Sequence, residues 1–425
     1  METGSDGERM RAFVLHPEIQ SDPKRREAKA ALDEAVSLAH ALPDLEVVGA
    51  EVARLRKPRP GLLFGEGKLE ELKARFEAAE IGLVLVDGPV TPVQQRNLER
   101  KWGVKLLDRT GLILEIFADR ARTREGVLQV ELAALSYQRT RLVRAWTHLE
   151  RQRGGLGFVG GPGETQIEAD RRAIDEAITR IRRQLSKVVR TRELHRAARE
   201  KVPFPIVALV GYTNAGKSTL FNRLTGAAVV AADMLFATLD PTMRGVVLPS
   251  GRKVILSDTV GFISDLPPQL VAAFRATLEE VLAADVILHV RDISHHETEE
   301  QAKDVEAILA DLGVKGEVPV FEVWNKTDLL PETERHAVLT EAARKDGVAA
   351  ISALTGEGVP DLLDRVSGAL EEEKTDRDLT LGFEEGKKRA WLHEHGVIEE
   401  EEQTEEGFRL RVRWTARQEK RFRDL

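Results

Sequence analysis

Eight residues beginning at Gly211 have the types and spacing that bind the phosphates of a nucleotide. They read Gly-Tyr-Thr-Asn-Ala-Gly-Lys-Ser and fit the pattern G-x-x-x-x-G-K-[ST]. A turn bounded by glycines lets several backbone N–H groups converge on one point, and a helix that begins there adds the positive end of its dipole. In this pattern Lys217 reaches the β- and γ-phosphates and the Ser218 hydroxyl binds Mg²⁺. The motif therefore predicts a site for a magnesium nucleotide.

The stretches on either side of the motif are those that such a site requires. Residues 206–210 are all apolar and predict a buried strand, and residues 217–225 predict a helix that ends at Gly226. A chance loop of the same composition would not need either element. The predicted nucleotide contacts in the loop are Gly211, Tyr212, Thr213, Asn214, Ala215, Gly216, Lys217, Ser218 and Thr219.

Two downstream segments could complete the phosphate side of the site. Residues 258–261, Asp-Thr-Val-Gly, follow a predicted strand, so Asp258 can hold Mg²⁺ through water and the N–H of Gly261 can face the γ-phosphate. Residues 233–240 supply the hydroxyl of Thr238, from a loop expected to be mobile. We expect Mg²⁺ at Ser218, Thr238 and Asp258, and nucleotide contacts at Phe236, Ala237, Thr238, Leu239, Asp240, Asp258, Thr259, Val260 and Gly261.

Two further segments could recognise the base. Asp328 follows the strand predicted at 320–324 and can accept hydrogen bonds from guanine N1–H and N2–H₂, which adenine does not offer. A buried carboxylate left unpaired by the wrong base discriminates by ~10⁴ or more. Residues 352–354 end the next strand and offer backbone N–H groups to guanine O6. Each segment alone is weak evidence, but five in this order on strand ends predict GTP. The predicted nucleotide contacts in these two segments are Asn325, Lys326, Thr327, Asp328, Ser352, Ala353 and Leu354.

The composition places limits on the class of protein. A chain of 425 residues with 42% hydrophobic and 32% charged residues can form two to four ordinary domains. The absence of cysteine excludes disulfides and thiol chemistry. The polar, acidic start is no signal peptide, and no apolar run approaches the ~18–20 residues of a membrane helix. We expect a cytoplasmic protein, with association at a membrane surface left open, and a monomer.

Strands and helices alternate in two parts of the chain, which predicts two α/β domains. After a disordered lead at 1–10, strands at 13–15, 46–53, 81–86 and 104–107 alternate with helices at 25–41, 66–80 and 93–101, giving a domain over 11–120 without a catalytic cluster. Residues 206–370 predict a doubly wound, mainly parallel sheet with helices at 270–283, 298–312, 332–345 and 359–370. Residues 376–425 predict a small α+β domain with one helix and a hairpin.

Residues 121–200 predict a long antiparallel helical hairpin. Leu128, Leu132, Leu135, Leu142, Trp146 and Leu149 form one apolar seam, and Ile174, Ile178, Ile181, Leu185 and Val188 form another. Residues 120–200 contain 18 Lys or Arg against 10 Asp or Glu, although the whole chain has a net charge of −8. A solvated helix face and a plain connector are the ordinary explanations for the arginines and for the glycine-rich residues 154–163.

A joint between two helices needs only ~2–8 residues, so a glycine-rich tip on a basic rod favours insertion into a phosphate-rich cleft. The RNA contacts that we predict are Arg139, Arg141, Arg144, Arg151, Arg153, Gly154, Gly155, Gly157, Gly160, Gly161, Arg171 and Arg172.

The set of motifs resembles the P-loop GTPases related to translation factors. Residues 236–241, Phe-Ala-Thr-Leu-Asp-Pro, and 258–263, Asp-Thr-Val-Gly-Phe-Ile, are similar to the Obg–HflX group. Residues 59–68, 137–142 and 161–168 narrow the resemblance to HflX, over the first domain, the hairpin and the GTPase. The resemblance implies a cytosolic GTPase that binds the large ribosomal subunit and splits stalled or idle ribosomes, with its hairpin pointing toward the peptidyl-transferase region. Family members are also linked to ATP hydrolysis through the first domain, but this chain has no second phosphate-loop motif.

Hydrolysis by such a site is an in-line attack of water on the γ-phosphoryl group, helped by positioning and charge neutralisation. Ras-like enzymes orient this water with a glutamine at the position occupied here by Phe262, so intrinsic turnover should be slow. Lys217, Thr238, Gly261 and Asn214 are the predicted catalytic residues. Related GTPases with asparagine at the place of Asn214 use K⁺ as a substitute for an arginine finger, so K⁺ is a second expected cofactor beside Mg²⁺.

Two other functions remain open at this point. A GTP-sensing adaptor could use the hairpin to bind a protein, and an RNA-remodelling NTPase could use it to move RNA. Salt dependence of ribosome association separates the first of these from RNA binding, and Asp328 argues against ATP as the main fuel.

Overall fold

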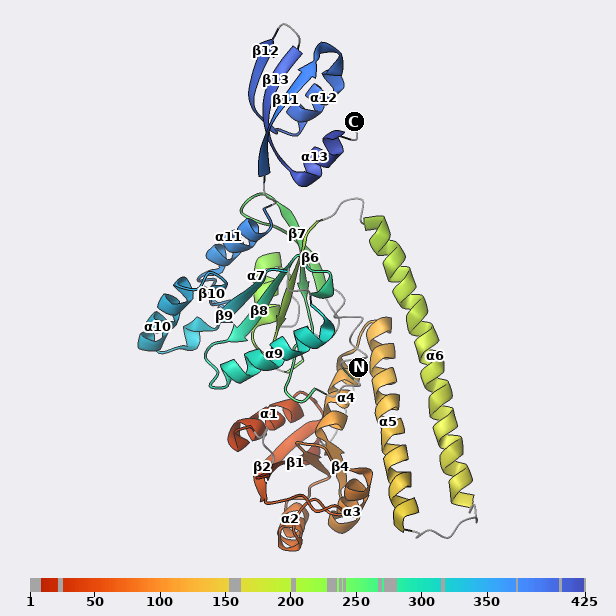
Figure 1. Ribbon diagram of the computed structural model, residues 1–425. Coiled ribbons are helices and arrows are strands. Elements are labelled where there is room, and N and C mark those ends of the chain that lie inside the picture. Colours follow the sequence, from red (N-terminus) through yellow and green to blue (C-terminus); the bar gives the residue numbers. More distant parts are fainter. Residues whose placement is uncertain are drawn as a thin grey trace, which may run out of the picture. The chain divides into compact units, whose positions relative to one another are not determined.

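The apolar run that precedes the phosphate-loop motif forms the central strand of a six-stranded sheet in the computed structural model (Figure 1). The structure describes residues 9–21, 26–152, 162–199, 204–227, 235–236, 239, 242–266, 270, 281–314, 318–371, 374–404 and 407–423. They form two compact units, 1–363 and 364–425.

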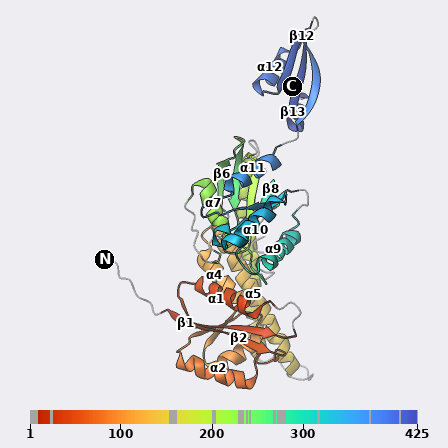
Figure 2. The ribbon, with the colours of Figure 1, turned by 90° about the vertical axis from the view of Figure 1, so that its left-hand side faces the viewer.

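The first domain is a parallel four-stranded sheet in the order β2-β1-β3-β4. Its elements are β1 (Met10–Ile19), α1 (Ala28–His40), β2 (Leu45–Leu55), α2 (Glu66–Ala78), β3 (Leu83–Val86), α3 (Pro92–Trp102), β4 (Lys105–Asp108) and α4 (Arg109–Arg120). β1 is longer than predicted because its polar ends continue to pair with β2, from Met10 beside Leu45 to Ile19 beside Leu55. Figure 2 shows α1 and α2 on opposite faces of this sheet.

Helix α4 is the main element that the apolar spacing does not predict. It follows β4 without any loop, because Asp108 ends the strand and also caps the helix by accepting a hydrogen bond of 2.9 Å from the N–H of Gly111. Its residues Leu112, Ile113, Ile116 and Phe117 are buried. They share one hydrophobic core with α1 and with the segment around Phe262 of the GTPase part.

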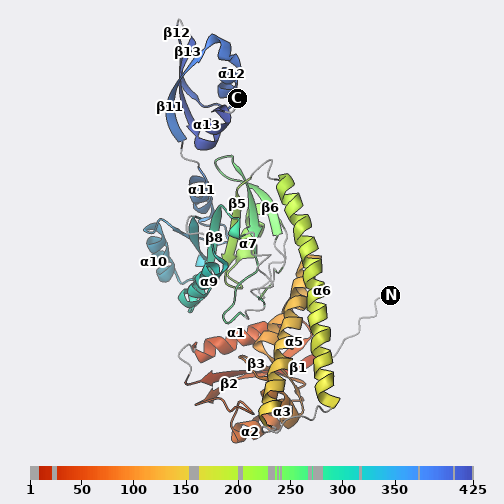
Figure 3. The same ribbon diagram turned by 45° about the vertical axis from the view of Figure 1, so that its right-hand side comes forward.

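The predicted helical hairpin consists of α5 (Arg124–Gln152) and α6 (Pro162–Arg199), which run side by side in Figures 1 and 3. In the described part of α6, Ile178 and Ile181 are the buried residues, as the predicted seam requires, and Leu128 is buried on α5. Trp146 and Leu149 have side chains outside the description. Arg139 of α5 pairs with Asp175 of α6 at 2.6 Å.

The GTPase part is the predicted doubly wound sheet, with the strand order β10-β9-β8-β5-β7-β6. Its elements are β5 (Ile206–Gly211), α7 (Lys217–Thr225), β6 (Thr242–Val247), β7 (Lys253–Asp258), β8 (Val286–Asp292), α9 (Thr298–Leu312), β9 (Val320–Asn325), α10 (Glu332–Ala343), β10 (Val348–Ala350) and α11 (Val359–Ala369). Among the strands that the structure describes in this sheet, β6, an edge strand that the sequence pattern does not predict, is the one that pairs antiparallel. Helices α7 and α9 lie on opposite sides of the sheet (Figure 2). Most of the helix predicted at 270–283 lies outside the described residues.

The second unit contains an antiparallel sheet in the order β11-β13-β12, which confirms an α+β fold. Its elements are β11 (Lys374–Gly382), α12 (Gly386–Glu394), β12 (Ile398–Thr404), β13 (Gly407–Thr415) and α13 (Ala416–Arg423); β11 and α13 were not predicted from sequence. Along β13, buried Leu410, Val412 and Trp414 alternate with arginines that pair with acidic side chains, such as Arg411 with Glu400.

Among the helices that the structure describes, none is both long enough and apolar enough to cross a membrane.

Candidate nucleotide site

The phosphate loop joins β5 to α7 and depends on glycine at both ends. Gly211 has φ +152°, and a Cβ there would lie 2.1 Å from the carbonyl oxygen of Val290. Gly216 has φ +95°, and a Cβ there would lie 2.1 Å from Nδ2 of Asn325. Both positions combine a backbone conformation that favours glycine with a neighbour that excludes a side chain. The loop therefore packs directly on β8 and on the end of β9.

Lys217 is buried at the start of α7, and among the residues that the structure describes no carboxylate forms an ion pair with it. Its Nζ donates to the carbonyl oxygens of Tyr212 at 2.7 Å and Gly211 at 3.1 Å. Burial lowers the pKa of Lys217 to about 8, although the negative charge of Asp258 acts in the opposite direction. A buried ammonium whose contacts in the described part of the chain are carbonyl oxygens gains a favourable partner in a phosphate group, which would supply negative charge.

The residues expected to hold Mg²⁺ meet beside this lysine. Ser218 Oγ donates a hydrogen bond of 2.7 Å to Oδ2 of Asp258, which lies at the end of β7. A hydroxyl and a carboxylate are hard oxygen donors, and Mg²⁺ is commonly held by one or two such groups together with substrate phosphates and water. The donor set therefore fits Mg²⁺. Thr238, the third predicted ligand, lies outside the described residues, as do Ala237 and Asp240.

The segment after Asp258 lies against the phosphate loop. The N–H of Thr213 donates to the carbonyl of Phe262 at 2.7 Å, and the N–H of Phe262 donates to the carbonyl of Gly211 at 3.1 Å. A Cβ on Gly261 would lie 2.8 Å from Thr213 Cγ2 and 3.1 Å from Lys217 Nζ, so only glycine allows this approach. Thr259, Val260 and Phe262 turn their side chains into the core.

The predicted base-binding segments meet on the other side of the loop. Asn325 Nδ2 donates to the carbonyl of Ala215 at 2.8 Å, and Asn325 Oδ1 accepts from the N–H of Ala353 at 2.8 Å. Lys326 Nζ pairs with Asp292 at 2.7 Å, and Thr327 Oγ1 donates to the carbonyl of Ile351 at 3.0 Å. Asp328 follows in a 3₁₀ turn and is partly exposed, which leaves its carboxylate able to reach a ligand.

Arg223, next to the site, makes contacts that the sequence motifs do not reveal. Arg223 of α7 donates through Nε to the carbonyl of Ala353 at 2.6 Å, and a Cβ on Gly356 would lie 2.6 Å from its Nη1.

Phe236 and Leu239, which were expected to contact nucleotide, are buried in the core. Their side chains serve packing, which leaves only their backbone for a ligand.

The hairpin residues expected to contact RNA fall into three groups. Arg141 is engaged inside the protein, since Nη1 lies 2.9 Å from Asp108 Oδ2 and Nη2 contacts Gln95, and the geometry assigns it a structural role. Arg139 pairs with Asp175, while Arg171 and Arg172 are exposed. The side chains of Arg144 and Arg151 lie outside the described part of the chain. Six predicted contacts lie outside it entirely: Arg153, Gly154, Gly155, Gly157, Gly160 and Gly161.

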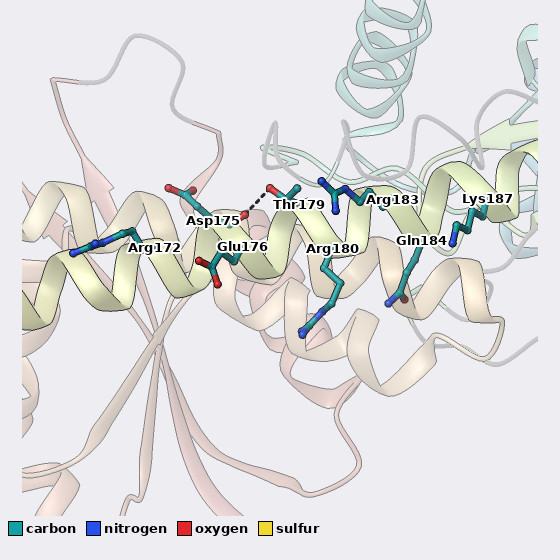
Figure 4. A pocket seen from close by; sticks show the side chains of 8 residues that line it. All are labelled: Arg172, Asp175, Glu176, Thr179, Arg180, Arg183, Gln184 and Lys187. Carbon is teal, nitrogen blue, oxygen red and sulfur yellow. Dashed lines mark hydrogen bonds between the residues drawn. The ribbon is translucent and has the colours of Figure 1, made fainter.

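Further cations lie on α6 beyond those that were predicted. A shallow hollow on this helix is lined by Arg172, Asp175, Glu176, Thr179, Arg180, Arg183, Gln184 and Lys187 (Figure 4). Four cations against two carboxylates give this face a positive charge. Arg180, Arg183 and Lys187 are exposed and recur at helical spacing, a signal that could have been read from the sequence.

Four family descriptions together match most of the chain. They are "GTP-binding GTPase N-terminal" at residues 29–118, "GTP-binding GTPase Middle Region" at 120–199, "50S ribosome-binding GTPase" at 206–326 and "HflX C-terminal domain" at 337–423.

Individual relatives agree with these matches. GTPase HflX of Magnetococcus marinus is 51% identical over 387 residues, which are 91% of this chain and 88% of that protein. GTPase HflX of Escherichia coli is 46% identical over 352 residues, 83% of this chain and 82% of that protein. A crystal structure of a GTP-binding protein from Sulfolobus solfataricus with GDP is 24% identical, covers 85% of this chain and 98% of its own, and has a TM-score of 0.45.

Proposed function

This chain belongs to the HflX family of GTPases, and from that premise we propose that it is a switch whose GTP state controls binding to the large ribosomal subunit. It binds and hydrolyses GTP, as its family does. The step driven by the switch is the splitting or rescue of stalled or idle ribosomes. The observation that supports this most directly is the positive face of α6 on the same compact unit as the nucleotide site.

In the proposed site, each part of the nucleotide has its own set of residues. Gly211, Asn214, Gly216 and Lys217 receive the phosphates, and Gly261 offers its N–H to the γ-phosphate. Ser218, Thr238 and, through water, Asp258 would hold Mg²⁺, which neutralises charge on the β- and γ-phosphate oxygens. Asn325, Lys326, Asp328, Ser352 and Ala353 form the guanine pocket, which already joins the phosphate loop through Asn325.

Hydrolysis in this site relies on positioning rather than on a general base. Phe262 stands where a water-orienting glutamine would be, and its side chain is only 1% exposed, so it cannot polarise water. Lys217 supplies positive charge toward the γ-phosphate from a buried position, where water screens it least. We infer slow intrinsic turnover, on the order of Ras alone. K⁺ bound near Asn214 and ordering of the Thr238 loop on the ribosome are the two proposed accelerators.

The hairpin is the proposed contact with ribosomal RNA. Phosphate contacts by exposed cations produce affinity that falls steeply with salt, because counterions are released on binding. Arg171, Arg172, Arg180, Arg183 and Lys187 provide such cations along one helix. The protein would act as a monomer in the cytoplasm, where its ribosomal partner is found.

Sedimentation of ribosomes tests this function. Intact ribosomes are centrifuged with the protein and either a non-hydrolysable GTP analogue or GDP, at several salt concentrations. We expect salt-sensitive co-sedimentation with large subunits in the GTP-analogue state and an increase in free subunits. Salt-insensitive binding would instead support an adaptor that recognises protein. Equal binding with GDP would contradict the switch.

A further inference from the structure

Helix α4 brings the first domain into contact with both segments that flank the γ-phosphate position. Arg109 at its start reaches Ser264, three residues after Gly261. Phe117, two turns later, packs edge-on against Phe236, with ring centroids 4.6 Å apart and planes at 84°. Phe236 precedes Thr238 by two residues. One helix of the first domain therefore contacts the segment of Gly261, which is predicted to face the γ-phosphate, and a residue close in sequence to Thr238, a predicted Mg²⁺ ligand.

The contact through Arg109 is buried and uses both ends of the guanidinium. Nη2 donates to the carbonyl oxygen of Ser264 at 2.9 Å and to Oε1 of Glu34 at 2.5 Å, and Nη1 donates to Oδ1 of Asp87 at 2.6 Å. The side chains of Arg109, Glu34 and Asp87 are 8%, 10% and 6% exposed. Such a charge-assisted fork has a defined geometry, so it fixes the carbonyl of Ser264 relative to the first domain.

Tyr212 connects the same cluster to the phosphate loop. Its hydroxyl donates to Glu34, accepts a hydrogen bond of 2.8 Å from the N–H of Ser264, and lies 2.6 Å from Ser264 Oγ. Glu34 therefore accepts from Arg109 and from Tyr212, which belong to different parts of the unit. Ser264 is held from two sides, through its carbonyl by Arg109 and through its N–H by Tyr212.

These bonds act on the backbone that carries Gly261. The segment from Gly261 to Ser264 is pressed against Thr213 and Lys217 at one end and clamped by Arg109 and Tyr212 at the other. A single N–H aimed at a phosphate discriminates only if its backbone is held in place before the ligand binds. The first domain supplies part of that support.

We propose that Arg109, Glu34 and Tyr212 are positioning residues that hold the N–H of Gly261 at the γ-phosphate position, so that the first domain sets the preference for GTP over GDP. This inference rests on the proposed nucleotide site and adds the source of its nucleotide discrimination. None of the three side chains has to touch the γ-phosphate. GDP has no γ-phosphate, so its affinity does not depend on the clamp, whereas that of a triphosphate does.

Replacing Tyr212 by Phe is the sharpest test, because it removes one hydroxyl and keeps the ring and the loop backbone. Tyr137→Phe is the matched control. Tyr137 is the other tyrosine of the chain, and its hydroxyl also donates to a buried carboxylate of the first domain, Asp108, at 2.5 Å. It makes no hydrogen bond to the phosphate loop or to residues 261–264 among those the structure describes. Arg109→Lys is the second variant, since it keeps the charge and loses the fork.

Calorimetric titration with a non-hydrolysable GTP analogue and with GDP gives the readout. We expect Tyr212→Phe and Arg109→Lys to lower the ratio of analogue affinity to GDP affinity by about tenfold, the worth of one hydrogen bond to a charged group. Tyr137→Phe should leave the ratio as in the unmutated protein. General loss of structure would weaken both nucleotides alike and leave the ratio unchanged.

An unchanged ratio in Tyr212→Phe and Arg109→Lys, with GDP bound as tightly as by the unmutated protein, would overturn the positioning role and leave the nucleotide site standing. An equal fall of the ratio in Tyr137→Phe would do the same. Failure of the unmutated protein to bind either nucleotide would overturn the site itself. Hydrogen exchange provides an independent check, because coupling is reciprocal. The analogue, but not GDP, should slow exchange at residues 109–117 in the unmutated protein, and Tyr212→Phe should abolish the difference.

Discussion

Ser218 Oγ lies 2.7 Å from Asp258 Oδ2, so the first turn of α7 is bonded directly to the end of β7. The two residues are 40 positions apart in sequence, and the parallel pairing of β5 with β7 brings them together. This pair is where the phosphate loop meets the segment that leads to Gly261. Its chemistry suits Mg²⁺, which prefers oxygen donors and retains water.

Ser218→Ala should weaken nucleotide binding only when Mg²⁺ is present. The variant loses a proposed metal ligand. Mutation of a residue that only hydrogen-bonds to a metal ligand already lowers metal affinity by about 10–100-fold. GTP affinity measured with Mg²⁺ should therefore fall by about that factor. Affinity measured in EDTA should match the unmutated protein, and a loss in EDTA of similar size would show that the hydroxyl acts without the metal.

Asp328→Asn should change the base that the protein prefers. The carboxylate accepts two hydrogen bonds from guanine, whereas an amide presents one donor group to the base and suits xanthine. Competition binding should show GTP weakened by ~10²-fold or more, as for other unpaired groups in a base pocket, and xanthosine triphosphate strengthened. A variant that keeps its preference for GTP would remove the role of Asp328 in base recognition.

His289 should make the stability of the protein depend on pH in the mildly acidic range. Burial lowers its pKa to about 4 from 6.5, with Glu322 opposing this shift and Arg291 and Lys217 adding to it. Between these values the unfolded chain binds a proton that the folded chain does not, so the free energy of unfolding falls as pH decreases from about 6.5 to 4, by about 3 kcal/mol in all.

Urea unfolding at pH 7 and pH 5 measures this effect, with His289→Gln as the comparison. The variant lacks the titrating ring, so its loss of stability between the two pH values should be smaller than that of the unmutated protein. Equal losses in the two proteins would show that His289 does not titrate as its burial implies.

Asn214 should be required for any stimulation by K⁺. It is exposed in the phosphate loop with φ +60°, so glycine is a better replacement than alanine for removing the amide without backbone strain. Single-turnover hydrolysis should be faster in K⁺ than in Na⁺ by about tenfold, a small part of the ~10³–10⁵ that an arginine finger supplies. Asn214→Gly should be equally slow in both salts, and a retained K⁺ effect would exclude this residue.

Substituting Arg180, Arg183 and Lys187 by alanine should weaken binding to large subunits and flatten its salt dependence. Each phosphate contact contributes ~0.7–0.9 to the magnitude of the slope of log affinity against log salt. The slope of the triple variant should therefore be smaller in magnitude by up to about 2–3. Arg344→Ala, at an exposed position after α10, is the control for a general change in charge. A slope that stays unchanged would place the RNA contact elsewhere.

The motifs around the phosphates and the base could be predicted because each is a short run of residues on a strand end. The long parallel strands and α9 could be predicted for a similar reason, since their apolar spacing is local. Helix α4 could not, because it begins at Arg109, directly after the residue that ends β4, and no turn residues separate them. The edge strands β6 and β11 lack a strong apolar pattern, as edge strands commonly do.

The clamp around Ser264 also has no local signature. Arg109 is 155 residues from Ser264, and Tyr212 is 178 residues from Glu34. The identity of an isolated arginine or glutamate says nothing about which distant partner it will meet. The same limit explains Arg141, which belongs to a basic stretch in sequence but is neutralised by Asp108 in the fold.

The hydrophobic core that runs from α1 and α4 to β5 and Phe262 has a consequence for thermal denaturation. The first domain and the GTPase part bury apolar side chains against each other, so unfolding of one would expose the core of the other. Residues 1–363 should therefore unfold in one cooperative heat-absorption peak. In a fragment that contains the GTPase part alone, Phe236 and Phe262 would lose the packing that the first domain provides and would be exposed to solvent. The excised fragment should then aggregate through its exposed apolar surface, even with every nucleotide-binding residue present.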